Sequence, residues 1–269
     1  MTWICRTCAV EHAEPLPDVC AICADERQWV PAQGQVWTTL EEVRREHRVV
    51  VDEVEPGLHG LAVEPQIGIG QTALLATTEA GNVLWDPVGL LDVAAVAAVR
   101  GLGPVAAIAA SHPHMFGVQV EWSRALGEVP VLVNEADARW VARPDPMIAT
   151  WGERAEPVPG VVLHRVGGHF PGSAVATWTG ADGRGVLLSG DTVAPNPDRA
   201  TVGFMRSYPN KIPLSATVVQ RVAASLERLD FDRIYGNFRG AVPARAKEAV
   251  RYSADRHIAW VRGDHDGET

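Results

Sequence analysis

The sequence predicts an α/β layered domain that follows a small cysteine-rich module. Apolar runs short enough for buried strands alternate with helical patterns from residue 72 onward, which is typical of α/β domains. All four cysteines fall within the first 23 residues, which sets that segment apart. The chain has 269 residues and is 46% hydrophobic, so it can bury one sizeable core and still carry a small appendage.

Composition narrows the classes of function. The formal net charge of −9 leaves no basic field to attract nucleic acid, so nucleic acid is not an expected partner. The apolar stretch at 90–110 is broken by Arg100 and by Gly103-Pro104, which predicts a helix and a buried strand rather than a membrane span. No basic, apolar leader pattern opens the sequence. We therefore expect a cytoplasmic protein without a membrane partner, and the oligomeric state stays open.

The segment 1–35 carries two C-x-x-C pairs. Each pair can form a tight knuckle, and two knuckles supply four thiolates for a tetrahedral metal. Two disulfides, or four ordinary thiols, are the alternatives. His12 lies between the pairs, and because four sulfurs complete a tetrahedron we expect it at the surface. The predicted ligands are Cys5, Cys8, Cys20 and Cys23.

This segment resembles rubredoxin-like modules. Trp3 stands two residues before the first cysteine, prolines interrupt the middle, and Trp29 closes the segment. The resemblance implies zinc or iron. A glycine usually follows each pair in rubredoxins, whereas this chain has Ala9 and Ala24, which argues against electron transfer. About 30 residues cannot bury enough apolar surface to be stable alone, so we predict a structural Zn²⁺, with iron as the alternative.

The second predicted domain spans 36–269. Residues 38–48 read as a short charged helix capped by Thr38 or Thr39, and 72–87 as a hairpin that turns through "EAGN". Apolar runs predict further strands, and a periodic apolar face with Ser215 as N-cap predicts a helix at 215–229. The remaining predicted elements are helices at 92–99 and 243–262 and strands at 105–110, 131–133, 161–166, 174–179, 185–191 and 231–237.

Four strand-to-loop junctions deliver residues able to bind a metal. Open α/β sheets place their sites at the carboxyl ends of strands, so these junctions are expected to meet in one crevice. An isolated histidine or aspartate at such a place is more often an ordinary loop residue. The junction residues are His112 and His114 in "SHPHMFG", His169 in "GGHFPGS", Asp191 in "SGDT" and Asn237 in "YGNFRG".

These motifs, in this order, resemble the metallo-β-lactamase fold over about residues 50–262, particularly its glyoxalase II and persulfide dioxygenase branch. The resemblance implies a four-layer αββα sandwich. It assigns the three histidines of the first metal site to His112, His114 and His169, and the carboxylate that reaches both metals to Asp191. The family's first motif is H-x-H-x-D-H, and a further histidine near position 237 completes its second metal site. This chain has Phe116, Gly117 and Asn237 at the second-site positions, which predicts a single metal in the main domain.

The predicted function is a metal-dependent hydrolase of a small ester, thioester or lactone-like substrate. Zinc held by three histidines keeps a position for water and lowers the pKa of that water to about 7. Asp191 and His114 are the candidate catalytic residues, with Asp191 as a ligand or as the group that orients water. Two alternatives stay open. One is a non-haem iron oxidoreductase with His112, His169 and Asp191 as a facial triad, and the other is a metal-binding domain without activity.

Substrate contacts are expected from loops that follow the Asp191 and Asn237 strands. Cations and a tyrosine there suit a small, anionic substrate, although the same residues are common as solvated surface groups. The candidate substrate-binding residues are Arg206, Tyr208, Lys211, Asn237 and Arg239.

Overall fold

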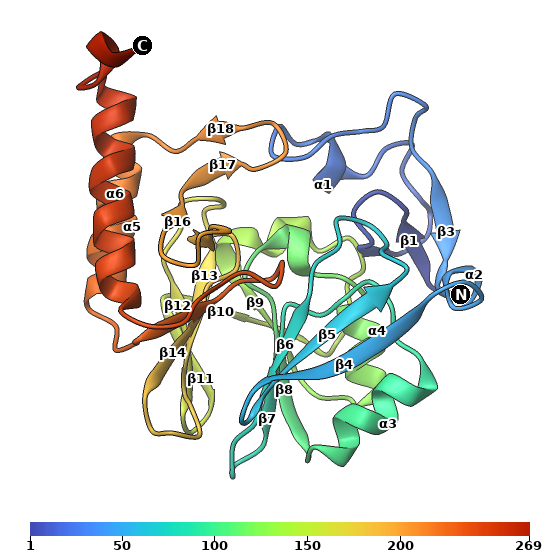
Figure 1. Ribbon diagram of the computed structural model, residues 1–269. Coiled ribbons are helices and arrows are strands. Elements are labelled where there is room, and N and C mark those ends of the chain that lie inside the picture. The colour runs from blue at the N-terminus through green and yellow to red at the C-terminus, as the bar shows by residue number, and fades with distance from the viewer.

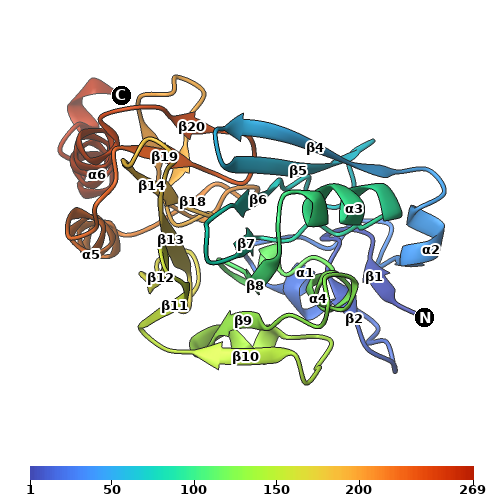
Figure 2. The same cartoon turned by 90° about the horizontal axis from the view of Figure 1, so that it is seen from below.

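Two mixed β-sheets stacked face to face form the centre of the molecule in the computed structural model, which describes residues 1–269 (Figures 1 and 2). The seven-stranded sheet has the order β10-β9-β8-β7-β6-β5-β4, and the six-stranded sheet has the order β11-β12-β13-β14-β19-β20. The first sheet comprises β4 (Arg48–Glu55), β5 (Leu58–Glu64), β6 (Ala73–Ala76), β7 (Asn82–Trp85), β8 (Val105–Ala109), β9 (Val131–Asn134) and β10 (Ile148–Trp151). The second comprises β11 (Arg154–Val158), β12 (Val161–Arg165), β13 (Ala174–Thr179), β14 (Gly185–Leu188), β19 (Arg233–Tyr235) and β20 (Ala241–Val242).

Helices cover the outer face of each sheet. The first sheet is flanked by α3 (Val93–Gly101) and α4 (Gln119–Ala125), and the second by α5 (Ala216–Glu227) and α6 (Ala246–Arg262). Apolar side chains fill the space between the sheets, with Trp85 from one sheet and Leu163, Trp178 and Leu188 from the other among them. The layers therefore run helix, sheet, sheet, helix, as the resemblance implied (Figure 2).

Most predicted elements are present. The hairpin is β6 and β7, in which Leu74 pairs with Trp85, and the predicted Ser215 cap accepts a hydrogen bond from the Val218 amide. The charged helix is shorter than predicted, because α2 (Leu40–Val43) ends before the long strand β4 begins at Arg48. Thr39 and Glu42 form a reciprocal capping box at the start of α2. The β4–β5 hairpin was not predicted, since β4 buries a single residue, Val49, and its charged face obscures the apolar pattern.

Several small elements complete the structure. They are the hairpins of β15 (Ala194–Pro195) with β16 (Val202–Gly203) and of β17 (Met205–Ser207) with β18 (Ile212–Pro213), and the 3₁₀ turns Pro113–Met115, Glu135–Trp140 and Asp266–Glu268. None of the helices combines the length and apolarity that crossing a membrane requires.

The cysteine-rich module packs directly on the main domain. It contains β1 (Trp3–Cys5), β2 (Glu11–His12) and α1 (Ala21–Ala24), and β1 also pairs with β3 (Trp37–Thr39), which lies beyond residue 35. The four cysteines belong to one hydrophobic cluster of 26 residues that also contains main-domain side chains such as Leu84, Phe116 and Trp122. A side chain at Gly89 would place its Cβ only 2.3 Å from the Ala9 Cβ. The main-domain residue that packs against Ala9 must therefore be glycine. One continuous core therefore joins the module to the first sheet.

Glu11 fixes this junction through both backbone and side chain. Its amide donates to the Gly117 carbonyl at 2.9 Å, and its carboxylate accepts from the Val120 amide at 2.6 Å and pairs with Arg143, also at 2.6 Å. Burial raises the pKa of Glu11 to about 7, although the Val120 amide and Arg143 oppose the rise. Glu121, which also pairs with Arg143, adds like charge nearby.

We predict that Glu11→Gln changes the pH dependence of stability. A carboxyl with a higher pKa in the folded state binds protons more tightly there, so its contribution to stability falls as pH rises from about 4.5 to 7. Each unit of pKa difference corresponds to about 1.4 kcal/mol. The wild type should therefore lose stability relative to Glu11→Gln between pH 5.5 and 7.5 in urea unfolding curves. Parallel curves for the two proteins would contradict the raised pKa.

Candidate metal centre

His112 and His114 leave the end of β8 in a short 3₁₀ turn that begins at Pro113. Asp86, which follows β7, holds this turn in place through hydrogen bonds. The carboxylate of Asp86 accepts from the Ser111 amide at 2.5 Å, from the Ser111 hydroxyl at 2.9 Å and from the Asn237 side-chain amide at 2.7 Å. Because the Ser111 hydroxyl gives its one proton to Asp86, it accepts from Nδ1 of His112 at 2.9 Å. The lone pair of His112 is thereby left on Nε2.

His169 is held by the glycine-rich loop between β12 and β13. Gly167 and Gly168 both have positive φ, at 73° and 97°, and the Phe170 amide donates to the Ser173 hydroxyl at 2.7 Å to close the turn. Nδ1 of His169 lies 3.1 Å from the Met205 carbonyl, which can only accept a hydrogen bond. Nδ1 of His169 therefore carries the proton, and Nε2 presents a lone pair to the other histidines.

Asp191 follows β14 and lies three residues beyond Leu188, the last residue of that strand. The preceding Gly190 has φ of 53°, and a Cβ there would lie 2.5 Å from the Ser111 hydroxyl oxygen. This close approach of the two loops requires glycine and brings the Asp191 carboxylate beside His112.

The four side chains converge at the spacing of a metal site. His114 Nδ1 lies 3.2 Å from His169 Nε2, and Asp191 Oδ2 lies 3.5 Å from His112 Nε2 and 3.7 Å from His169 Nε2. All four ligand atoms fall within 4.8 Å of one another. A tetrahedral metal about 2.05 Å from each ligand would space them about 3.3 Å apart. Nε2 of His112 is buried without a hydrogen-bond partner, as expected of an atom reserved for a metal.

The electrostatics favour the protonation states that bind metals. Burial lowers the pKa of His169 to about 4 and holds the pKa of His114 well below its ordinary value, because a charged imidazolium is disfavoured away from water. Burial acts to raise the pKa of Asp191, but its interactions with the adjacent imidazoles of His112 and His169 outweigh the effect of burial and keep that pKa below its ordinary value. Burial also raises the pKa of Asp86 to about 7, although the hydrogen bonds that Ser111 donates to it oppose the rise. Neutral imidazoles beside an ionised Asp191 are a metal-binding set.

The residues at the three positions of the second metal site have structural roles. Phe116 is buried in the core shared with the cysteine module. A Cβ at Gly117 would lie 2.1 Å from the Pro87 carbonyl oxygen, so no side chain fits there. The amide nitrogen of Asn237 is engaged by Asp86. These three positions contribute to packing and to the support of His112.

The four cysteines form a second cluster. All are free and buried, with Sγ–Sγ separations of 3.6 Å for Cys5–Cys23 and 3.8 Å for Cys8–Cys20. Four sulfurs about 2.3 Å from one metal would lie about 3.8 Å apart, whereas a disulfide needs about 2.05 Å. The distances fit a Cys₄ metal site and exclude the two-disulfide alternative.

The surroundings of this cluster differ from the sequence expectation in two places. His12 is not at the surface: it is buried, packs edge-on against Trp37 and places Nε2 3.4 Å from Cys20 Sγ. The expectation failed because β2 turns His12 inward against β1 and β3. Ala9 adopts the left-handed conformation, with φ of 60°, that a glycine would take after the first pair. Its amide donates to the Cys5 carbonyl at 2.8 Å, so alanine preserves the knuckle.

The five candidate substrate residues occupy different environments. Tyr208 lies nearest the histidines, with its ring 6.0 Å from that of His169, and its one hydroxyl proton is shared between the Gly203 and Asp191 carbonyls at 3.1 and 3.3 Å. Asn237 is buried beneath the site. The remaining three residues are directed elsewhere or exposed: Arg206 pairs with Glu26, Arg239 pairs with Asp52 at 3.4 Å, and Lys211 is exposed.

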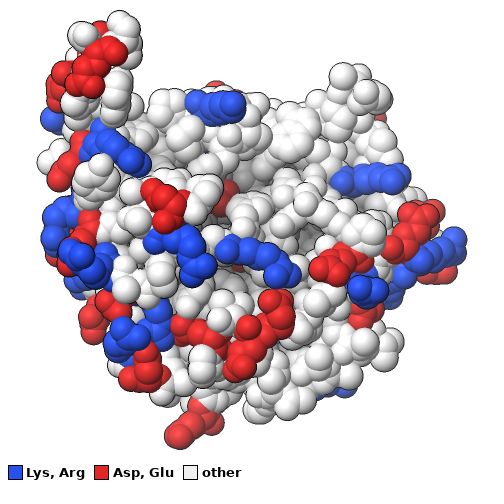
Figure 3. Space-filling view, in the orientation of Figure 1, with Lys and Arg blue, Asp and Glu red and all other residues white.

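On the face shown in Figure 3, acidic and basic side chains are interspersed around a hollowed, mostly uncharged stretch. This face therefore carries no large electrostatic field of one sign.

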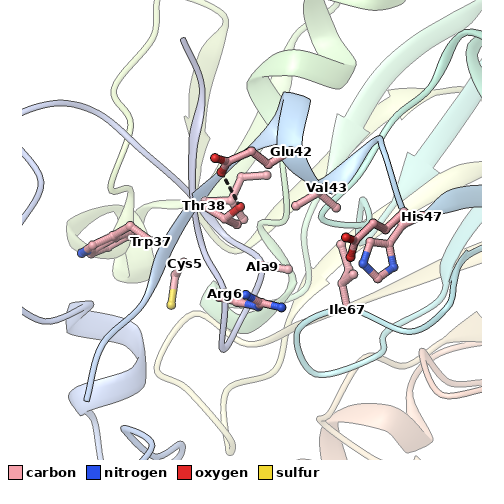
Figure 4. Close-up of a pocket in the computed structure, with 11 residues that line it drawn as sticks. Cys5, Arg6, Ala9, Trp37, Thr38, Glu42, Val43, His47 and Ile67 are labelled. Carbon is pink, nitrogen blue, oxygen red and sulfur yellow. Dashed lines mark hydrogen bonds between the residues drawn. The ribbon is translucent and has the colours of Figure 1, made fainter. Parts of the chain in front are cut away.

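A pocket of about 360 Å³ lies at the junction of the cysteine-rich module and the main domain (Figure 4). Cys5, Arg6 and Ala9 line it from one side and Glu42 and His47 from the other, with Thr38 bonded to Glu42. None of the four converging residues lines this pocket, so it is separate from the metal centre.

Sequence reasoning missed three supporting residues. Asp86 had a usable signal, since it is an acid at the end of an apolar strand in "VLWDP", the same feature that marked His112. Ser111 and Arg27 carried no such signal, because their roles depend on contacts with Asp86 and with the His169 carbonyl.

The chain has the same fold as several solved structures. No protein-family model matches the chain. Solved structures with the same fold include the DIM-1 metallo-β-lactamase exposed to ceftazidime (TM-score 0.56, 11% identity, 78% of this chain and 97% of that chain). Another is MEM-A1, a subclass B3 metallo-β-lactamase isolated from a soil metagenome library (TM-score 0.53, 14% identity, 82% and 97%). At these identities the likeness shows the fold, and it confirms the predicted metallo-β-lactamase architecture.

One curated relative is much closer in sequence. The uncharacterized protein YmaE of Bacillus subtilis (strain 168) is 43% identical over 268 residues, with 97% of each chain covered. Identity at this level over nearly the whole length extends through both the cysteine-rich module and the main domain. The chain therefore belongs to the family of YmaE.

Proposed function

We propose that the protein is a metal-dependent hydrolase that acts on a small ester, thioester or lactone-like carbonyl through one metal held by His112, His114, His169 and Asp191. The observation that carries the proposal is the convergence of three imidazole nitrogens and one carboxylate oxygen from three separate loops. Two of the imidazoles are oriented by an oxygen behind them, the Ser111 hydroxyl and the Met205 carbonyl. A zinc ion in such a set acts as a Lewis acid that polarises a carbonyl and activates water.

The residues around the set have distinct roles in this proposal. Asp191 is the least buried of the four, with 5% of its surface exposed against 1–2% for the histidines, so substrate and water approach from its side. Its carboxylate would either complete the coordination of the metal or orient a water molecule there, and His114 would help to hold the metal. Burial raises the pKa of Tyr208 well above its ordinary value, so its hydroxyl stays protonated and positions the Asp191 backbone. Arg206, Lys211 and Arg239 remain candidates for contact with an anionic substrate.

The cysteine cluster favours one alternative. Gln35 Nε2 donates to Cys5 Sγ at 3.2 Å and His12 Nε2 lies 3.4 Å from Cys20 Sγ. Hydrogen bonds to sulfur tune the potential of thiolate-bound iron. With iron in both clusters, His112, His169 and Asp191 would form the facial triad of a non-haem iron oxidoreductase.

We predict that His169→Ala abolishes both metal binding at this centre and turnover. The matched control is His164→Ala, because His164 lies five residues earlier on β12, is bonded to Thr177 and takes no part in the cluster. Zinc-loaded and iron-loaded proteins are assayed in air against thioesters, lactones and persulfides. Zinc-dependent hydrolysis that is lost in His169→Ala and kept in His164→Ala supports the proposal. Turnover with iron alone, accompanied by O₂ consumption, would replace it with the oxidoreductase, and inactivity with both metals would favour a binding-only domain.

A further inference from the structure

We propose that Arg27 is a positioning residue that couples the folded cysteine module to the His169 ligand loop. The proposal rests on the metal centre described above and adds a regulatory link to it. In this view, metal occupancy of the Cys₄ cluster controls how tightly the histidine cluster binds its own metal.

Arg27 reaches the histidine cluster from the module. It follows Cys23 by four residues, and its side chain is 7% exposed and paired with Asp25 at 2.6 Å. Nε of Arg27 donates to the His169 carbonyl at 2.7 Å, and the guanidinium lies 4.1 Å from the centre of the Phe170 ring. The stacking contact and the directional hydrogen bond together fix the backbone at the point where the ligand leaves it.

The segment around Arg27 also holds the second support of His169. The Ser207 hydroxyl donates to the Arg27 carbonyl at 3.0 Å, and the Asn210 side-chain amide donates to the Glu26 and Gln28 carbonyls at 2.9 Å each. These bonds dock the β17–β18 hairpin onto the module, as its position beside α1 in Figure 1 shows. The same hairpin provides the Met205 carbonyl that orients His169 Nδ1. His169 is therefore fixed at its backbone and at its ring by groups that the module holds in place.

This arrangement makes the two clusters interdependent. Residues 25–28 follow α1, which carries Cys23 and directly follows Cys20, so their conformation depends on a formed Cys₄ cluster. Without that cluster the backbone that carries Arg27 is not held in place. The loop that begins with Gly167 and Gly168 then loses the one arginine that bonds to the His169 backbone. Loss of the thiolate-bound metal, by oxidation or chelation, should then weaken metal binding by the histidines. The chain would lose activity under oxidising conditions although none of the histidine-cluster ligands is a thiol.

The test measures metal affinity directly. Full-length protein is loaded with Co²⁺, because thiolate-to-cobalt absorption reports the Cys₄ cluster separately from the weaker bands of the histidine site. Chelator competition then gives the affinity of the histidine site in the wild type, Arg27→Ala, Arg27→Lys and Arg44→Ala. Arg44 is the matched control, since its Nε also donates to a backbone carbonyl, that of Leu91 at 2.8 Å, away from both clusters.

Arg27→Ala is expected to weaken the histidine site by about 10–100-fold, the usual effect of removing a group that orients a ligand. Arg27→Lys should recover part of the loss because it keeps one donor, and Arg44→Ala should match the wild type. The thiolate absorption should stay unchanged throughout. Wild-type affinity in Arg27→Ala would overturn the proposal, and so would loss of the thiolate signal in that variant, which would assign Arg27 to the folding of the module. If Arg27→Ala fails to fold, Arg27→Lys decides the question, because unchanged affinity in that variant, without the planar donor, would refute the positioning role.

The outcome is independent of the hydrolase proposal. An affinity change in a protein that hydrolyses nothing would retain the coupling and reject the function. Hydrolysis that is unchanged when Arg27 is replaced would retain the function and reject the coupling.

Discussion

Replacing Cys20 with serine is expected to destabilise the whole chain and not the N-terminal module alone. The four cysteines lie in the same hydrophobic cluster as Leu84, Phe116 and Trp122 of the main domain, so a disordered module exposes one side of the first sheet. Structural zinc contributes about 10–16 kcal/mol of apparent binding free energy at neutral pH. Domains are stable by only about 5–15 kcal/mol, so loss of the metal removes a comparable amount.

The measurement is urea unfolding followed by tryptophan fluorescence, together with soluble yield. Thr7→Ser is the control, since Thr7 lies between Cys5 and Cys8 but supplies no sulfur. A Cys20→Ser protein that keeps one cooperative transition at the wild-type midpoint would show that the module contributes little to the stability of the main domain.

The second large effect is expected at Gly117. A Cβ there would lie 2.1 Å from the Pro87 carbonyl and 2.8 Å from the Val88 carbonyl, with φ at 50°. The left-handed backbone alone costs a non-glycine residue about 1–2 kcal/mol, and relief of the overlap must displace the turn that carries His114. Gly117→Ala should therefore destabilise the chain by roughly 3 kcal/mol or more and weaken metal binding by the histidines.

Gly183→Ala separates the two causes. Gly183 also has a positive φ, at 78°, but a Cβ there meets nothing within 4 Å, so this variant carries backbone strain without the overlap. Equal losses in Gly117→Ala and Gly183→Ala would mean that the close approach to Pro87 is not what excludes a side chain at 117.

The same geometry predicts that installing Asp at 116 and His at 117 will not recreate a second metal site.

The candidate ligand set could be predicted from the sequence because each of its residues lies in a loop that follows an apolar strand. Strand ends in a layered α/β domain meet at one edge, and His112, His169 and Asp191 occupy such ends. The hairpin at 73–85 and the long helices were predicted for a related reason, since their apolar patterns are periodic and uninterrupted. Strand β4 escaped prediction because most of its residues face solvent or are charged.

The supports of the site could not be predicted in the same way. Arg27 acts on a residue 142 positions away, and Ser111 is defined by its contact with Asp86, so neither has a local pattern. Arg206 and Arg239 illustrate the opposite problem. Both are cations near the expected crevice in the sequence, yet in the structure they pair with Glu26 and Asp52.

The central claim is that the main domain holds one metal, at His112, His114, His169 and Asp191, beside the one in the Cys₄ cluster. The most direct test is elemental analysis of metal-saturated, desalted protein against its protein concentration, in the wild type and in His169→Ala. The account predicts two metals per chain in the wild type and one in His169→Ala. Three metals in the wild type and two in the variant would contradict it, because a dinuclear centre would then exist despite Phe116, Gly117 and Asn237.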